Sequence, residues 1–248
     1  MIIKAVLHSS FILILLHLVG CQKELNFEQN VEISSIGDKS NFEKIALGNG
    51  KIGVLKSKKN KDLLIFINDA SQSKEEIERY IEMYYFMGFD VLIYNYGVKN
   101  KVVSLDAISK EFISIKENLT QQGYLQSRIV VFGCNRTSAL AINFCNISEL
   151  RGCIIENPSK IIEDKIVKLM TNLKTPILIL QGEKSDVSSL ITTVKYFSSI
   201  PISNKKKITI LTNITDRDMF YDDEYLKSVS DFYPTLSGFN ENYPSIKW

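Results

Sequence analysis

Residues 133–137 form a predicted strand-to-helix turn, which is a position where a catalytic nucleophile could lie. The segment RIVVFGCNRTSALAINFC (128–145) has an apolar run typical of a buried strand, then a glycine, then a helical pattern. In a G-x-S-x-G motif, such a turn presents a serine as the nucleophile of acyl transfer. Asn135 occupies the position of that serine, and Thr137 that of the second glycine, whose loss is expected to relax the turn. Because a carboxamide cannot be activated as a serine or cysteine can, Asn135 is not expected to act as a nucleophile.

The general base that such a nucleophile needs is also missing. The two histidines of the chain, His8 and His17, both lie in an N-terminal segment with the features of a signal peptide. The mature chain would therefore contain no imidazole, which excludes a mechanism with a histidine base.

Three other nucleophiles have to be weighed. Cys134 precedes the nucleophile position, Ser138 lies in the first helical turn, and Ser185 follows Lys184. A residue one step earlier on a tight turn points elsewhere, and a serine in a first helical turn ordinarily caps or packs. A Ser–Lys pair would need a desolvated lysine of lowered pKa, whereas this loop is expected to be exposed. We expect none of the three to be catalytic.

The N-terminal segment MIIKAVLHSSFILILLHLVGCQKE resembles a lipoprotein signal peptide. Lys4 precedes an apolar run, and Gly20 comes directly before Cys21. The ending Leu-Val-Gly-Cys resembles a bacterial lipobox, which implies cleavage before Cys21 and attachment of fatty acyl chains, palmitate among them, to that residue. Several acyl chains would hold the protein durably at a membrane of the cell envelope. Gln22 instead of an aspartate favours the periplasmic face of the outer membrane if the organism is Gram-negative; an ordinary signal peptide or anchor is the alternative.

The rest of the chain has the size of a single domain with a substantial core. Removing 20 of the 248 residues leaves 228 and takes away one charge, Lys4, so that 29 basic residues stand against 28 acidic ones. This nearly neutral balance lacks the excess of basic residues that is typical of a protein that binds nucleic acid. The other cysteines, Cys134, Cys145 and Cys153, lack metal-ligand spacing, so we expect small buried side chains, with a disulfide as the alternative, and no metal or cofactor.

Short apolar runs alternate with helical patterns along the chain. The predicted strands are 51–55, 63–67, 90–96, 128–133, 152–156, 176–182 and 207–213. The predicted helices are 73–88, 104–123, 137–145, 159–170, 186–199 and 222–233. Continuously apolar strands are typical of a sheet covered on both faces, so this order predicts βαβ units and a mainly parallel sheet, an α/β fold. The aromatic residues 84–86, at the end of the first helix, are expected to face the core.

The order of these elements resembles a lidless α/β-hydrolase of the BEM46-like serine hydrolase group, from about Phe42 to Phe232. Three matches carry most of the resemblance. VVFGCNRTSALAI (130–142) resembles VVLGHSLGGALAI around the nucleophile, residues 175–189 resemble the loop with the catalytic acid, and residues 211–232 resemble the histidine loop and last helix. The resemblance implies a twisted, mainly parallel sheet with helices on both faces and no large lid.

The chain departs from that family at each catalytic position. Asn135 replaces the nucleophile, Ser185 takes the place of the acid although Asp186 follows it, and Asp216 stands where the histidine is expected. In the oxyanion turn, residues 67–70 (Ile-Asn-Asp-Ala) replace His-Gly-Asn-Ala, which puts a carboxylate beside a region that normally stabilises negative charge. We therefore expect no catalytic residues.

Polar residues at the carboxyl ends of the strands form a candidate ligand site, because ligands of open α/β sheets bind at that edge. The candidates are Asn68, Asp69, Asn135, Arg136, Asp186, Asp216 and Arg217. Their oxygens could hold a hard cation, or Arg136 beside a helix N-terminus could hold an anionic group. The alternative is that these residues only hydrogen-bond one another and fill a defunct site.

The sequence thus predicts a signal peptide (1–20), a polar tether (21–40), an α/β-hydrolase-like domain (41–233) and a tail (234–248). The tail contains Trp248 and either packs on the domain or exposes an apolar patch. We expect a catalytically inactive envelope lipoprotein, anchored to the membrane through Cys21, that binds a small molecule or a protein. A hydrolase of esters or peptides with a non-histidine mechanism is the alternative.

Overall fold

The structure is a computed structural model and describes residues 42–48, 51–57, 62–68, 72–95, 105–159, 163–186, 188–216 and 218–235. The predicted signal peptide, the tether and the tail beyond residue 235 lie outside these residues. No helix within the described ranges is long and apolar enough to cross a membrane.

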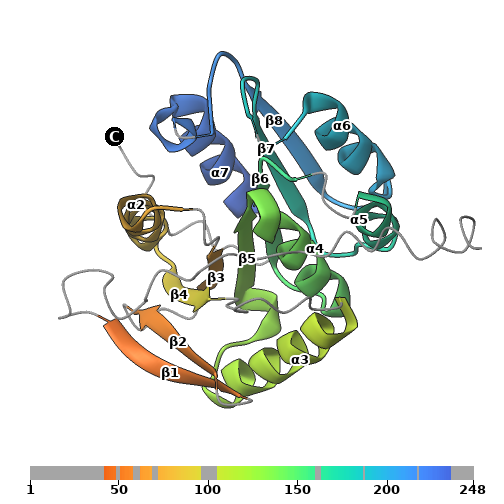
Figure 1. The fold of residues 1–248 in the computed structure, drawn as a ribbon. Coiled ribbons are helices and arrows are strands. Elements are labelled where there is room, and N and C mark those ends of the chain that lie inside the picture. Colours follow the sequence, from red (N-terminus) through yellow and green to blue (C-terminus); the bar gives the residue numbers. More distant parts are fainter. Residues whose placement is uncertain are drawn as a thin grey trace, which may run out of the picture.

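A twisted sheet runs through the middle of the domain (Figure 1). Its strands are β1 (Phe42–Gly48), β2 (Lys51–Lys56), β3 (Leu63–Asn68), β4 (Asp90–Asn95), β5 (Ile129–Cys134), β6 (Gly152–Glu156), β7 (Ile177–Gly182) and β8 (Lys206–Leu211). Their order in space is β1-β2-β4-β3-β5-β6-β7-β8. The pairs β1–β2 and β2–β4 are antiparallel, and the other pairs are parallel. The seven predicted strands and the mainly parallel sheet are confirmed.

Strand β1 is a strand that the sequence analysis did not predict. Its sequence, FEKIALG, mixes charged and apolar residues, and in it only Leu47 is buried. As an edge strand, β1 has a neighbour on one side only, so it does not need the apolar run that marks the covered strands.

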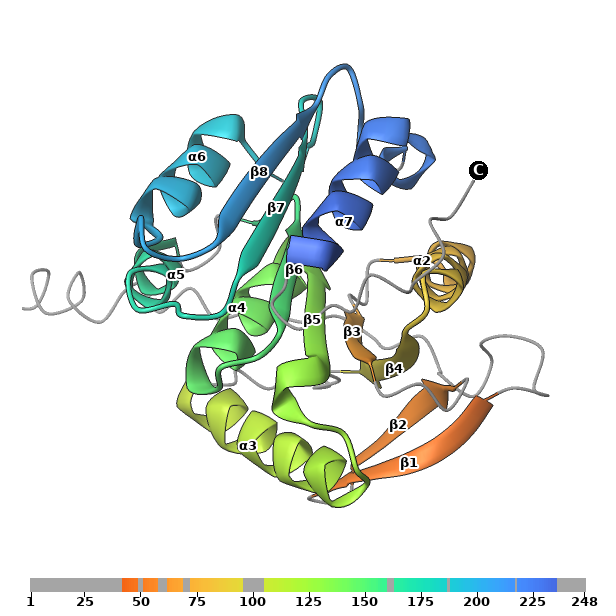
Figure 2. The ribbon, with the colours of Figure 1, turned by 180° about the vertical axis from the view of Figure 1, so that it is seen from behind.

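Helices cover both faces of the sheet (Figures 1 and 2). They are α2 (Lys74–Phe86), α3 (Leu105–Gln121), α4 (Ser138–Ile147), α5 (Glu163–Met170), α6 (Leu190–Ser199) and α7 (Asp223–Thr235). Helices α3 to α6 share one apolar core with the sheet, and α2 and α7 share the other. The alternation along β3 divides its side chains, with Ile65 and Ile67 in the first core and Leu64 and Phe66 in the second. The six predicted helices are confirmed.

Two details of the helices differ from the predictions. Helix α6 begins at Leu190 instead of residue 186, because the side chain of Ser189 caps it by accepting a hydrogen bond from the Thr192 N–H. At the end of α2, Tyr84 is buried as predicted, but Phe86 is 68% exposed, so the prediction that residues 84–86 face the core is wrong for Phe86. Two residues of helix separate them by about 200° around the axis, which turns Phe86 away from the sheet.

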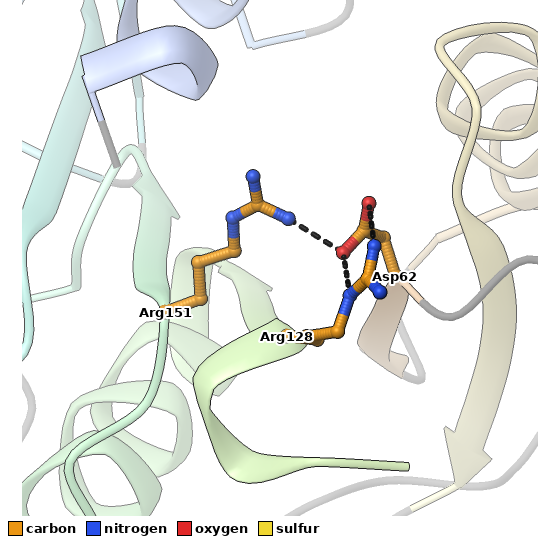
Figure 3. Close-up of polar contacts among 3 residues, drawn as sticks. All are labelled: Asp62, Arg128 and Arg151. Carbon is orange, nitrogen blue, oxygen red and sulfur yellow. Dashed lines mark hydrogen bonds and ion pairs between the residues drawn. The ribbon is translucent and has the colours of Figure 1, made fainter. Parts of the chain in front are cut away.

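A buried ion cluster lies at the amino ends of the parallel strands, opposite the candidate site. The carboxylate of Asp62, just before β3, accepts hydrogen bonds from Arg128 Nε (2.8 Å) and Arg151 Nη1 (2.6 Å), which precede β5 and β6 (Figure 3). The side chains of Asp62 and Arg151 are only 2% and 5% exposed. A buried guanidinium and a buried carboxylate each need the other, so Asp62 joins three neighbouring strands at this edge.

Replacing Asp62 with alanine should lower the free energy of unfolding by about 3–5 kcal/mol, because it removes the carboxylate that pairs with the buried Arg151 guanidinium. Urea denaturation measures this change. The control is Glu149→Ala, which removes an exposed ion pair with Lys174 and should cost less than about 1 kcal/mol. Equal losses in the two variants would contradict a special role for Asp62.

Candidate ligand site at the carboxyl ends of the strands

The turn after β5 keeps the backbone of a nucleophile elbow. Asn135 has a φ of 48°, in the left-handed region that asparagine tolerates better than most residues. At Gly133 the strand and the following turn approach so closely that an added Cβ would lie 2.5 Å from the Thr137 carbonyl oxygen. The strained conformation and the close approach are therefore both present, with an amide side chain at the tip of the turn.

Thr137 holds this turn together, which corrects the expectation that it relaxes the turn. Its hydroxyl accepts a hydrogen bond from the Cys134 N–H (3.0 Å) and donates one to the Cys134 carbonyl (2.9 Å). Thr137 is fully buried. The hydroxyl satisfies two backbone groups that a glycine at this position would leave to other partners.

The three other side chains that could act as nucleophiles, Cys134, Ser138 and Ser185, are held by packing or by hydrogen bonds to the backbone. Cys134 is 1% exposed and belongs to the core between the sheet and α2 and α7. The Ser138 hydroxyl, equally buried, lies 3.2 Å from both the Gly133 and the Glu156 carbonyl oxygens and donates to them. Ser185 accepts a hydrogen bond from the Ser188 N–H, and Lys184 beside it is exposed, so the desolvation that a Ser–Lys pair requires is not provided there.

The acid loop and the histidine loop meet, as the sequence predicts for strands that end at one edge. The Asp186 N–H donates to Oδ2 of Asp216 (3.0 Å), and Asp186 is itself exposed. Oδ1 of Asp216 is buried and accepts no hydrogen bond from the part of the chain that the structure describes. Arg136 follows Asn135 in a 3-10 turn (Asn135–Thr137) and is half-buried.

Two further side-chain oxygens at this edge, both from asparagine amides, also lack a donor within the described ranges. Asn68, the last residue of β3, is 4% exposed, and its Nδ2 donates to Oδ1 of Asn95 at 2.6 Å. Among the residues that the structure describes, no donor reaches its own Oδ1 or the buried Oδ1 of Asn135. Unpaired buried oxygens are uncommon in native proteins, so three of them along one edge require an explanation.

The predicted residues Asp69 and Arg217 lie outside the described part of the chain. Within the described part, no group of three or more His, Cys, Asp and Glu side chains is arranged to hold a metal ion. Cys134, Cys145 and Cys153 are buried free thiols, as their spacing predicts, and the disulfide alternative is not realised.

Glu156 is a residue of this region that the sequence analysis missed. It ends β6 opposite Cys134, is 2% exposed, and accepts hydrogen bonds from the phenols of Tyr80 (2.6 Å) and Tyr225 (3.1 Å). The pKa of Glu156 is raised to about 7, chiefly by burial and also by the nearby charge of Asp216, while the hydrogen bonds from Tyr80 and Tyr225 act to lower it. The sequence held a signal for this residue, a carboxylate closing the apolar run GCIIE.

Comparison with known proteins identifies the fold. No protein-family model and no curated protein matches the chain. Solved structures match it along most of their length. The esterase Pf2001 of Pyrococcus furiosus has a TM-score of 0.68 and 15% identity, over 88% of this chain and 99% of that one. A predicted CIB-like hydrolase from Thermoplasma acidophilum has a TM-score of 0.62 and 15% identity, over 79% and 98%.

Est1E from Butyrivibrio proteoclasticus is similar at a TM-score of 0.62 and 10% identity, over 79% of this chain and 98% of that one. At such identities the likeness concerns the fold and not the activity. Together with the sheet order and the two helical layers, it establishes that this chain has an α/β-hydrolase fold.

The buried carboxyl of Glu156 should make stability depend on pH. Because its folded pKa of about 7 exceeds the ordinary 4.5, the folded chain binds the extra proton, and this stabilisation is fully present below pH 4.5. It is lost as the pH rises to 7 and amounts to about 3 kcal/mol. Urea unfolding at pH 5 and pH 8 should give a larger difference for the wild type than for Glu156→Gln, which cannot ionise. The same difference in both proteins would contradict the assignment.

Proposed function

We propose that this chain is a non-catalytic, ligand-binding envelope lipoprotein built on the α/β-hydrolase fold. The observation that carries the proposal is Asn135 at the tip of an intact elbow, with its φ of 48° and its amide in place of a nucleophile. A side chain held in that conformation is presented at the strand edge, but a carboxamide cannot attack an acyl group.

The surroundings of the elbow support the same conclusion. From residue 21 onward the sequence contains no histidine, so no imidazole can serve as the base. The acid and histidine loops supply Asp186 and Asp216, which hydrogen-bond to each other through a backbone N–H. A carboxylate is a weaker base than an imidazole at neutral pH, so this pair does not supply what the missing histidine would.

Unpaired oxygens favour a ligand over a purely structural role for this edge. If the site were a filled remnant, Asn135 and Asp216 would be expected to pair with neighbouring donors. Instead, no described residue donates to Oδ1 of Asn68, Asn135 or Asp216, and each such oxygen costs about 1–3 kcal/mol when left unpaired. A bound molecule that donates hydrogen bonds would remove that cost.

The membrane anchor rests on the sequence around Cys21. We place the protein in the bacterial envelope, on the periplasmic face of the outer membrane in a Gram-negative cell, with Cys21 as the acylated first residue. A further part of the proposal is membership of the lidless BEM46-like group. In its favour, β6 and β7 are separated by few residues, with α5 as the helix described between them.

A hydrolase with a non-histidine mechanism is the second candidate, and Cys134 and Ser138 are its nearest nucleophiles. Both are 1% exposed, and the Ser138 hydroxyl donates to two backbone carbonyls. Burial of this kind disfavours attack on a substrate, since the nucleophile must reach the reacting carbon.

Ester hydrolysis is the direct test of the non-catalytic proposal. The chain from residue 22 onward, assayed with short and medium acyl esters, should give no turnover above buffer, and neither should Cys134→Ala or Ser138→Ala. Circular dichroism of each protein verifies that it is folded. Turnover by the wild type would contradict the proposal, and its loss in one variant would name the nucleophile.

Lipid attachment can be tested separately. The full chain expressed in a bacterial host with radiolabelled palmitate should incorporate label and sediment with membranes. Cys21→Ser should lose both properties, because the acylated sulfur is removed. The matched control is Cys145→Ser, a buried cysteine of the domain that should leave labelling unchanged. Label retained in Cys21→Ser would exclude this anchor.

A further inference from the structure

Helix α6 has large apolar side chains on the side that faces away from the sheet. The buried residues of this helix are Thr192, Thr193 and Tyr196. Successive residues are about 100° apart around the helix axis, so Ile191 and Val194 lie on the opposite side, where they are 82% and 48% exposed. The outer face of a helix in a globular protein is ordinarily polar, so two aliphatic residues one turn apart on it indicate a surface that contacts something else.

A third exposed isoleucine lies at the tip of the turn after α6. This turn, residues 201–204, is closed by a hydrogen bond from the Asn204 N–H to the Pro201 carbonyl oxygen (3.0 Å). Ile202, in its second position, is 96% exposed. Glycine, proline, asparagine, aspartate and serine are the usual residues of turns, so neither the backbone nor the core accounts for an isoleucine here.

Hydrogen bonds fix this turn in place. Nδ2 of Asn204 donates to two backbone carbonyls in the segment that joins α5 to β7 (3.2 and 3.0 Å). Nζ of Lys206 donates to two carbonyls at the carboxyl end of α6 (3.1 and 2.8 Å). The turn therefore lies against both helices, α5 and α6 (Figure 2), and it presents Ile202 from a fixed backbone.

The same part of the chain is basic. Residues 187–215 contain no aspartate or glutamate, although the whole chain has 28 acidic residues, and they contain four lysines: Lys195, Lys205, Lys206 and Lys207. Lys207 lies 3.9 Å from Asp231 on α7. Lys195, on the outer face of α6, and Lys205, beside the turn, are both exposed. Positive charge thus flanks the exposed aliphatic side chains.

An anionic phospholipid bilayer is the partner that fits this combination. Aliphatic side chains enter the boundary between headgroups and acyl chains, and nearby lysines are attracted by the negative surface potential of the lipid. A second copy of the chain fits less well. A two-fold interface would bring the same lysines of both copies together, and like charges across an interface oppose binding.

The proposed anchor at Cys21 would hold the domain near such a bilayer without choosing its orientation. Residues 22–41, between the anchor and β1, can span at most about 70 Å. A tether of that reach allows any face of the domain to meet the lipid, so the chemistry of the surface decides which face does.

We infer that the outer face of α6 and the turn after it dock on an anionic phospholipid bilayer, with Ile191, Val194 and Ile202 entering its headgroup layer. The inference rests on the proposed membrane anchor and adds the orientation of the anchored domain. Helices α2 and α7, which pack on the other face of the sheet, then point away from the lipid.

Fluorescence quenching by lipid tests this orientation. The full lipidated chain with Ile202→Cys is labelled with a small fluorophore and reconstituted in vesicles that contain a lipid with a nitroxide quencher near its headgroup. The other cysteines of the domain are buried and do not compete for the label. The label should be quenched in vesicles of phosphatidylcholine and phosphatidylglycerol, and much less in phosphatidylcholine alone. The control is Phe86→Cys, 68% exposed on α2, whose label should remain unquenched in both.

Two further substitutions in the chain labelled at position 202 separate the two interactions. Ile191→Ser removes an apolar side chain, and Lys195→Glu reverses a charge. Each should lower the ratio of docked to undocked domains, taken from the quenched fraction, by about tenfold. The control is Lys74→Glu, which makes the same change of charge on α2 and should leave this ratio unchanged.

The outcomes distinguish the inference from the anchor on which it rests. A chain that floats with the vesicles, but whose label at position 202 is not quenched or is quenched no more than at position 86, would overturn the inference and leave the anchor intact. Shielding of position 202 that is equal in both lipids and grows with the number of chains per vesicle would assign the surface to a second copy instead. A chain that does not float with vesicles would contradict the anchor and the inference together.

Discussion

The close packing of β5 against the turn that begins α4 is the constraint on which the rest of the site depends. It requires a residue without a Cβ at Gly133, and it forces Asn135 into a left-handed conformation. Hydrogen bonds then fix the turn, both within it and from the segment that follows β6. The Thr137 hydroxyl pairs with both backbone groups of Cys134, and the Asn135 carbonyl accepts from the Ser159 N–H at 3.2 Å. None of these contacts involves the side chain of Asn135. The conformation of the turn therefore does not depend on whether that side chain is a nucleophile.

The polar side chains at the two edges of the sheet differ in how fully they are hydrogen-bonded. At the amino edge, Asp62 is fully used by Arg128 and Arg151, which stabilises the start of three neighbouring strands. At the carboxyl edge, Asn68 and Asn135 have side-chain oxygens to which no residue in the described ranges donates. An edge of the first kind serves folding. Unpaired oxygens like those at the carboxyl edge lower stability unless a ligand binds to them. Such a local cost is the pattern expected at a functional site.

Much of the fold could be predicted from the sequence, because its covered strands are continuous apolar runs and its helices carry clear periodicity. The edge strand β1 could not, since partial exposure removes that pattern. Thr137 was expected to loosen the turn; its effect depends on two hydrogen bonds whose geometry is visible only in three dimensions. The meeting of Asp186 and Asp216 followed from topology. The burial of Glu156 under Tyr80 and Tyr225 did not, because those tyrosines come from helices 76 and 69 residues away in sequence.

The central claim is that the elbow survives without an activated nucleophile, and covalent labelling tests it most directly. The folded chain is incubated with a fluorophosphonate, which reacts with activated serines, and its intact mass is measured, with a serine hydrolase of the same fold as the positive control. No mass increase is expected for this chain, while the control is fully labelled. A single adduct on the folded chain, lost when the protein is denatured before labelling, would mean that the elbow does hold an activated nucleophile.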